Sequence, residues 1–207
     1  NKFLGDKTGQ GFYKKTKEKD ENGRKIILGL DLKTLEYKPT ERPNLPSLKA
    51  AKDIENLGKR VNAFVDADDK GGEMIKRSLG GLFAYVSNRI PEIADDLYSI
   101  DDALRAGFAW ELGPFEYWDA IGVEKGIEMA EAQGEQISDW VKDMVKAGHT
   151  SFYQTADGKK QYYDQVSKTY KTVPGTEEFI ILDNYREQSP VFKNDEVVLH
   201  DIGDGVL

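Results

Sequence analysis

The sequence predicts a mainly α fold, a helical bundle with short β-strands and hairpins at both flanks. Apolar residues recur every three to four positions over residues 47–147, which is the period of amphipathic helices. Glycine and proline punctuate residues 1–46, and short aromatic and β-branched runs follow residue 148, as in strands joined by turns. With 207 residues, the chain is long enough for one main core with appendages.

Composition excludes several kinds of site. The chain has no cysteine and two histidines, so disulfides, thiolate catalysis and cysteine-containing zinc sites are excluded, and histidine metal chemistry has almost no ligands. No apolar run approaches the roughly 20 residues that span a bilayer. The first residues show neither a signal-peptide nor a transit-peptide pattern. We therefore expect a cytoplasmic protein with no membrane span.

Charge is unevenly distributed along the chain. Residues 1–60 carry 15 lysines and arginines against 9 acidic residues, whereas residues 61–207 carry 14 against 28. The basic part alternates lysine with acidic residues, as in residues 17–21, and has no arginine cluster. Nucleic-acid binding is therefore not expected.

The first 46 residues predict a β-hairpin followed by a linker. Asn22-Gly23 is a signal for a two-residue hairpin turn, and residues 12–13 and 26–28 can pair across it. Three prolines between residues 39 and 46 disfavour both helix and central strand, because proline lacks a backbone donor and has a fixed φ.

Helices are expected from residue 47 to residue 147. Ser47 is a candidate N-cap for a helix over residues 47–65, and a second helix over residues 74–90 has a weak point at Gly80-Gly81. The string Ser99-Ile100-Asp101-Asp102 is typical of a capped helix start. Three more helices are expected, each closed by a glycine: 114–121, 124–133 and 135–147.

β-structure is expected again after residue 148. Residues 151–154 and 160–163 flank Asp157-Gly158 and predict a hairpin. Residues 179–182 and 196–199 predict two more strands. The apolar ending is unlike a frayed polar terminus and favours a sequence cut from a longer chain.

Acidic pairs are the first candidates for catalysis. Residues 91–150 hold 14 acidic and 4 basic side chains, and Asp95-Asp96 and Asp101-Asp102 suggest a carboxylate pair of the glycosidase type. Neighbours on a helix point about 100° apart, so such a pair does not converge on one bond. We interpret the pairs as solvated helix faces, and an acid-pair hydrolase stays a third hypothesis for the function.

The other candidates also have simple interpretations. His149 suits the carboxyl end of a helix, and His200 beside Asp201 has no serine nucleophile to activate. Residues 5–11 lack the helix start of a phosphate loop, and no dinucleotide-binding fingerprint is present. No catalytic, cofactor-binding or metal-binding residue is therefore assigned. Five aromatic residues are expected to serve core and interface packing rather than to form a ligand site: Phe108, Trp110, Phe115, Tyr117 and Trp118.

Two strings resemble one family. Residues 1–14 resemble the motif that closes the C-terminal helical domain of 3-hydroxyacyl-CoA dehydrogenases. Residues 100–104 and 107–122, which include Gly113-Pro114-Phe115-Glu116, resemble the core of a second copy of that domain. The wider pattern, including residues 30–37 and 198–206, is similar to bacterial bifunctional proteins in which an enoyl-CoA hydratase follows the dehydrogenase.

The resemblance implies a fragment of such a protein. Residues 1–46 would be the closing arm of a preceding helical domain plus a proline-rich linker, residues 47–148 the second helical copy, and residues 149–207 a β-rich segment leading toward a missing hydratase domain. The partners would be the upstream NAD-binding and helical domains and the downstream hydratase of the same chain. Acyl-CoA would be the substrate and NAD the cofactor of the parent enzyme, with no cofactor in this fragment.

The function that the resemblance implies is structural. The chain would be a non-catalytic portion of an NAD-dependent oxidoreductase of fatty-acid β-oxidation, packing on the catalytic half and shaping the acyl-CoA site. The family's substrate-contacting asparagine is not matched, because Asn88-Arg89 stand only three residues before Glu92, and Phe83 occupies the expected place. The alternative is a stand-alone helical protein-interaction module that uses the face from Trp118 to Ile121 as a partner groove.

Overall fold

The computed structural model describes residues 3–40, 43–176, 178, 180, 185 and 190–203. It divides into two compact units, Asn1–Asn44 and Leu45–Leu207. Each unit is described by itself.

The first unit is a small antiparallel sheet in the order β1-β2-β3. Tyr13 pairs with Gly29, and Leu28 pairs with Pro39. The predicted hairpin is confirmed, but its loop is longer than two residues, since Asp20 Oδ1 accepts hydrogen bonds from the backbone N–H groups of Asn22 and Arg24. The elements of this unit are the 3-10 turn η1 (Asp6–Thr8), β1 (Tyr13–Lys19), β2 (Lys25–Leu30) and β3 (Tyr37–Pro39).

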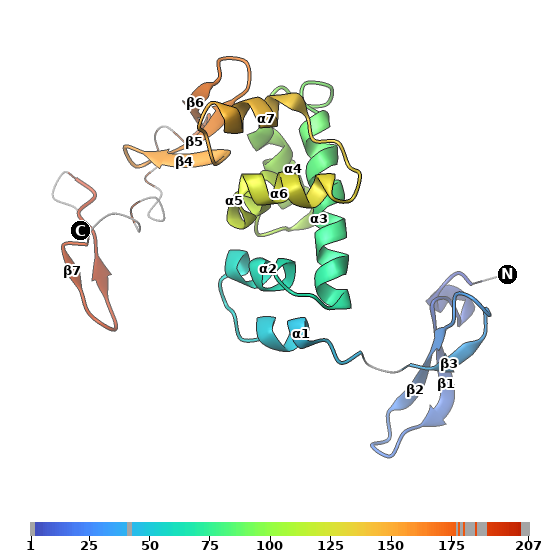
Figure 1. The fold of residues 1–207 in the computed structure, drawn as a ribbon. Helices are drawn as coiled ribbons and strands as arrows, with labels where there is room; N and C mark the ends of the chain where they lie inside the picture. The colour runs from blue at the N-terminus through green and yellow to red at the C-terminus, as the bar shows by residue number, and fades with distance from the viewer. Residues whose placement is uncertain are drawn as a thin grey trace. The chain divides into compact units, whose positions relative to one another are not determined.

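The second unit combines helices with short strands. The longest helix is α3, and both α5 and α6 contact it (Figure 1). Its helices are α1 (Pro46–Ala51), α2 (Leu57–Val65), α3 (Lys70–Asn88), α4 (Leu97–Phe108), α5 (Pro114–Ile121), α6 (Val123–Glu131) and α7 (Asp139–Lys146). Its strands are β4 (Tyr153–Ala156), β5 (Lys159–Asp164), β6 (Thr169–Thr172), β7 (Phe192–Lys193) and β8 (Val198–Leu199).

The helix predicted over residues 47–65 is in fact two helices, and its predicted cap is wrong. The chain leaves α1 after Ala51 and starts α2 behind Asn56, whose side chain accepts from the Lys59 N–H at 2.9 Å. A side chain that caps a new helix competes with continuation of the old one. Ser47 lies within α1, where its N–H donates to the Asp69 carboxylate at 2.8 Å.

Two other helix predictions also need correction. The α4 helix starts earlier than predicted, because Asp96 is its N-cap and accepts from the Ser99 N–H at 2.8 Å. The helix α3 runs without a break through Gly80-Gly81, the predicted weak point. A Cβ at Gly80 would lie 3.2 Å from the Ala130 Cα atom, so glycine permits α3 and α6 to approach closely.

The hairpin predicted after residue 148 is confirmed. Ala156 pairs with Lys159 across a two-residue loop, in which Asp157 and Gly158 have φ values of 51° and 68°. Such left-handed values are typical of the tightest hairpin turns. The strand predicted over residues 196–199 is present as β8, paired with β7. Of the strand predicted over residues 179–182, all but residue 180 lies outside the described residues.

Helices and strands of the second unit share one core. Trp118 stacks on Phe83 with ring centroids 4.6 Å apart, and Phe152, which immediately precedes β4, packs 5.0 Å from Trp118. Tyr163 of β5 and Val173 after β6 belong to the same cluster of buried side chains. The strands therefore supply part of the interior that the helices close.

The predicted mainly α class is wrong. The described structure has seven helices, with 40% of residues helical and 20% in strands of three small antiparallel sheets, so the fold is a mixed α/β one. The prediction treated the strands as flanks of a finished bundle. The helices are short and expose apolar edges that β4 to β6 cover, which is the tertiary reason for the difference.

A matched pair of glycine substitutions tests this packing. Gly126 lies in α6, and a Cβ there would overlap the indole of Trp118, whose Nε1–H donates to the Val123 carbonyl at 2.9 Å. Gly126→Ala should therefore lower the free energy of unfolding by about 1–3 kcal/mol through overpacking. Gly81→Ala, in α3 with nothing within 4 Å of its Cβ, should raise it by up to about 1 kcal/mol. Chemical denaturation measures both, and equal effects would contradict the close contact at Trp118.

Candidate functional site

The second of the two strings that resemble the dehydrogenase family contains Asp101, a fully buried carboxylate of α4. Its oxygens accept from the N–H groups of Phe115 at 2.9 Å and Glu116 at 3.2 Å, both in the first turn of α5, and from the hydroxyl of Tyr153 at 2.9 Å. Gly113, the N-cap of α5, has no side chain to do this, and a Cβ there would overlap Asp101. Asp101 therefore caps α5 from a neighbouring helix.

A second carboxylate, Asp119 of α5, holds the start of β4. It accepts from the backbone N–H of Phe152 at 2.7 Å and from that of Tyr153 at 2.8 Å. Tyr153 thus donates its N–H to Asp119 and its hydroxyl to Asp101. One residue of β4 is bound to two helices.

Glu116 adds an ionic layer to the cluster. It accepts from the Gly113 N–H at 2.8 Å and forms ion pairs with Lys160 of β5 at 2.5 Å and with Arg105. The Lys160 ammonium also lies 4.3 Å from the centroid of the Tyr153 ring. Lys160 and Arg105 are thus both held by Glu116 beside the buried carboxylates.

Burial and charge shift the ionisation of this cluster. Burial raises the pKa of Asp101 to about 7 and that of Asp119 to about 7, against the opposing effect of their hydrogen bonds. Burial also raises the pKa of Tyr153, which faces Asp101. The pKa of Glu116 lies below its usual value despite burial, because Lys160 and the Gly113 N–H stabilise the charged form.

These contacts revise the prediction for the acidic pairs. The solvated-face interpretation is wrong for Asp101, although Asp95 is exposed and Asp96 caps α4. Asp101 and Asp119 face backbone donors and lie in neither of the two cavities described below. In this arrangement the oxygens of both carboxylates accept hydrogen bonds from donors of the fold, so the two side chains have structural contacts.

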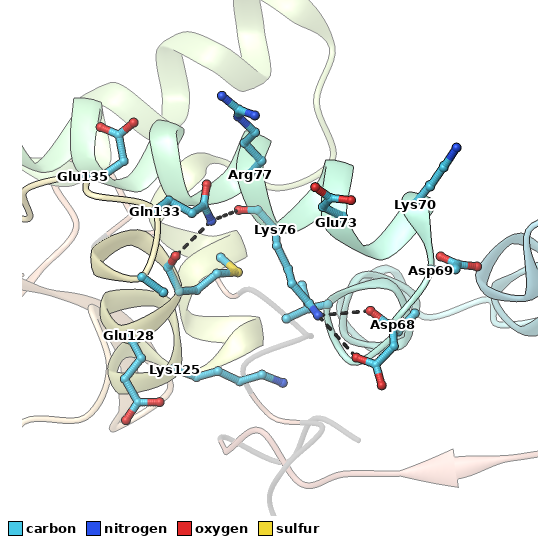
Figure 2. Close-up of a pocket in the computed structure, with 14 residues that line it drawn as sticks. Asp68, Asp69, Lys70, Glu73, Lys76, Arg77, Lys125, Glu128, Gln133 and Glu135 are labelled. Atoms are coloured by element: carbon cyan, nitrogen blue, oxygen red, sulfur yellow. Dashed lines mark hydrogen bonds and ion pairs between the residues drawn. The ribbon is translucent and has the colours of Figure 1, made fainter.

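The larger cavity lies between the end of α2, the first half of α3 and α6, with a volume of about 940 Å³ (Figure 2). Figure 2 shows Lys76 reaching toward Asp68. The Lys76 ammonium also donates to the Ala67 carbonyl at 3.0 Å. Gln133 donates to the carbonyls of Lys76 and Met129, both at 2.9 Å, and so ties α3 to α6. The charged lining residues are Asp68, Asp69, Lys70, Glu73, Lys76, Arg77, Lys125, Glu128 and Glu135.

The chemistry of this cavity is mixed. Acidic and basic side chains alternate around it, and Lys125 is held by Asp66 at 2.6 Å. Among the described residues, no group of three or more histidine and acidic side chains is arranged to hold a metal ion. We assign no cofactor or metal to these residues.

The remaining candidates have structural roles. The His149 ring lies 5.1 Å from that of Tyr163, and the backbone N–H of His149 donates to the Met144 carbonyl near the end of α7. Residues 5–11 form the η1 loop, closed by a hydrogen bond from the Gly5 N–H to the Gln10 carbonyl at 2.9 Å. His200 is partly buried, and its Nδ1 atom has no partner among the described residues.

The residues singled out by the resemblance and by its alternative lie mostly inside the fold. Asn88 donates to the carbonyls of Ala84 at 2.8 Å and Gln136 at 2.7 Å, and Phe83 is fully buried. Trp118 and Ile121 are buried as well, so the face proposed as a partner groove is not free.

The five aromatic residues expected at core or interface positions divide into two groups. Phe115 and Trp118 are fully buried, and Tyr117 is half-buried. Phe108 is 71% exposed and Trp110 is 37% exposed, so these two lie outside the core.

Sequence reasoning missed the contacts of α5 with the strands. Asp119 accepts from Phe152 and Tyr153, and Glu116 accepts from Lys160, across separations of 33 to 44 positions. The only sequence signal was the string around Trp118 and Asp119 in the family resemblance. The spacing of apolar residues along a helix does not show that one of its carboxylates binds a distant strand.

Comparison with known proteins supports the resemblance. The chain is 36% identical, over 205 residues, to a protein of Bacillus subtilis (strain 168) named "Probable 3-hydroxyacyl-CoA dehydrogenase"; the match covers 99% of this chain and 25% of that protein. Two Rickettsia proteins have names that describe a fatty acid oxidation complex trifunctional enzyme. The protein of R. felis is 25% identical over 56% of this chain and 14% of its own length, and that of R. prowazekii is 23% identical over 60% and 15%.

The resemblance to 3-hydroxyacyl-CoA dehydrogenases is thereby confirmed. The chain spans about a quarter of the length of the Bacillus relative and less of the two Rickettsia relatives. No family model matches the chain, and no solved structure matches it significantly. None of the described helices is both long enough and apolar enough to cross a bilayer.

The carboxylate cluster makes the stability of the chain depend on pH. The pKa of Asp119, about 7 when folded, lies above the unfolded value of 3.8, so the folded state binds more protons between these two pH values. The free energy of unfolding should therefore fall as pH rises from about 4 to 7, by at most about 1.4 kcal/mol per pH unit for each such carboxylate. Asp119→Asn should flatten this slope, and it should lower stability throughout because one of two N–H groups loses its acceptor. Urea unfolding between pH 5 and pH 8 measures both effects. Asp95→Asn, at an exposed carboxylate, is the control, and identical slopes in the two variants would refute the assignment.

Proposed function

We propose that this chain is a non-catalytic portion of an NAD-dependent 3-hydroxyacyl-CoA dehydrogenase of fatty-acid β-oxidation, a cytoplasmic oxidoreductase. In this proposal it packs on the catalytic half of its parent and shapes the acyl-CoA site. The observation that carries the proposal is the similarity to the Bacillus protein, which runs through 99% of this chain.

The positions of the motif residues support a structural role. The second of the two strings that resemble the family supplies Asp101, Phe115, Trp118 and Asp119, which are buried or engaged with backbone donors inside the core. A group that reacts with substrate must be accessible to the substrate. These side chains are instead engaged in core packing and in capping backbone N–H groups. The reacting groups and the NAD site are therefore assigned to other parts of the parent.

The domain assignment is part of the same proposal. Residues 1–46 act as the closing arm of a preceding helical domain and its linker, residues 47–148 as a second copy of the helical segment, and residues 149–207 lead toward a hydratase. The names of the Rickettsia relatives, which describe trifunctional enzymes, support a parent with several activities. The upstream domains and the hydratase of the same chain would be its partners.

Burial in the first unit supports a role as a closing arm. Among its described residues only Gly11 is buried, and Phe12 is 72% exposed. A sheet of three short strands without a buried apolar face is marginally stable by itself. Such a unit gains stability when another surface covers its apolar side chains.

Activity measurements test the enzymatic assignment. The 207-residue chain alone should show no NAD-dependent oxidation of 3-hydroxybutyryl-CoA, whereas the full-length product of its gene should oxidise it. In that full-length protein, Phe115→Ala should shorten the half-life of activity on heating without changing the pH profile of kcat, because Phe115 is fully buried in the core. Turnover by the isolated chain, or an inactive full-length protein, would contradict the proposal.

Hydrogen exchange tests the closing arm. In the isolated chain, the amides of β1 and β2 should exchange much faster than those of α5 and β5, because the first unit buries almost no side chain. In the full-length protein the same amides should become protected, while those of α5 change little. Equal protection of β1 in both preparations would show that this sheet needs no cover.

A further inference from the structure

A second cavity of the Leu45–Leu207 unit has a different chemistry from that in Figure 2. It is a groove of about 420 Å³ between α2, α3, the link from α4 to α5, and Tyr117 of α5. This volume lies within the usual range of small-molecule sites, about 300–1,000 Å³. Eight of the lining residues are apolar or aromatic and form its walls: Leu57, Val61, Phe64, Ile75, Leu79, Ala109, Trp110 and Tyr117.

The groove carries almost no charge. Glu111 is the one charged side chain that lines it, and no lysine or arginine does. The pKa of Tyr117 is raised by burial and by Glu111, so its hydroxyl stays neutral at physiological pH. A carboxylate or phosphate inside the groove would lack a partner and would be repelled by Glu111, so the part of a ligand that enters must be uncharged.

The mouth of the groove exposes aromatic surface. Ala109 ends α4 in the left-handed conformation, with φ 54°, and the chain then places Trp110 edge-on to Tyr117 with ring centroids 5.9 Å apart. Trp110 lines the groove and is 37% exposed. Covering such aromatic surface is a large source of binding free energy.

We propose that this groove binds the hydrocarbon tail of a fatty acyl ligand and leaves the polar head outside. The choice of a fatty acyl chain rests on the proposed function in β-oxidation, whereas the demand for an uncharged apolar ligand comes from the lining. A methylene group takes a volume close to the roughly 30 Å³ of a water molecule, so the groove has room for about a dozen carbon atoms.

The experiment blocks the groove with a bulky side chain introduced at its edge. Ser78 is an exposed residue of α3 that lines the groove, and the adjacent Arg77 is exposed and lines the cavity of Figure 2 instead. Calorimetric titration of the 207-residue chain with laurate and with lauroyl-CoA should give saturable 1:1 binding. Ser78→Phe should weaken both by at least tenfold, whereas Arg77→Phe should change them less than twofold. Thermal melts of both variants check that the fold is kept.

Two further readouts place the ligand. Laurate should change the fluorescence of Trp110, and Trp110→Phe should remove most of that change, because Trp118 is fully buried in the core and does not line the groove. Coenzyme A without an acyl chain should not compete with laurate. Lauroyl-CoA and laurate should compete with each other, since only the tail is bound.

The outcomes separate this inference from the proposed function. Absence of saturable binding, or equal weakening in both phenylalanine variants, would overturn the groove assignment. So would protection of Trp110 from iodide quenching in the ligand-free full-length protein, because a protein segment would then fill the groove. Oxidation of 3-hydroxybutyryl-CoA by the full-length protein tests the proposed function independently, since a four-carbon acyl chain has almost no tail to place in the groove.

Discussion

Asp101 caps a helix to which it does not belong, and the second unit is arranged around that carboxylate. Gly113 begins α5 without a side chain, and the space that a Cβ would need is filled by Asp101 from α4. An uncapped helix start inside a protein leaves backbone N–H groups without partners, at a cost of about 1–3 kcal/mol each. The same carboxylate accepts the hydroxyl of Tyr153, so α4, α5 and β4 are locked in one relative position.

The aromatic core depends on this lock. Asp119 binds the N–H groups of Phe152 and Tyr153, and Phe152 is thereby inserted among Phe115 and Trp118, with centroids 4.9 and 5.0 Å away. The string over residues 100–122 that resembles the dehydrogenase family therefore describes how this unit is built. The match identifies relatives but no reacting group, because the carboxylates of Asp101 and Asp119 accept hydrogen bonds from backbone N–H groups.

Capping and turn residues predicted helices and hairpins well where neighbouring residues alone determine where these elements begin and end. The helix α5 runs over residues 114–121 as predicted, with proline in its first turn and Gly122 at its end. The hairpin around Asp157-Gly158 also follows from its turn residues. The helix expected over residues 47–65 was wrong, because apolar spacing continued across a break that Asn56 imposes by capping α2.

The sequence by itself determined the local elements, the uneven charge and the family resemblance, since each depends on residues close together in the chain or on the string itself. Only the tertiary structure decided that Asp101 is buried, that β4 to β6 complete the core, and that Phe108 and Trp110 stay at the surface. The donors to Asp101 lie 14, 15 and 52 positions away. Hydrophobic period reports which face of an element is buried, but it carries no information about which distant element covers that face or which distant donor meets a carboxylate.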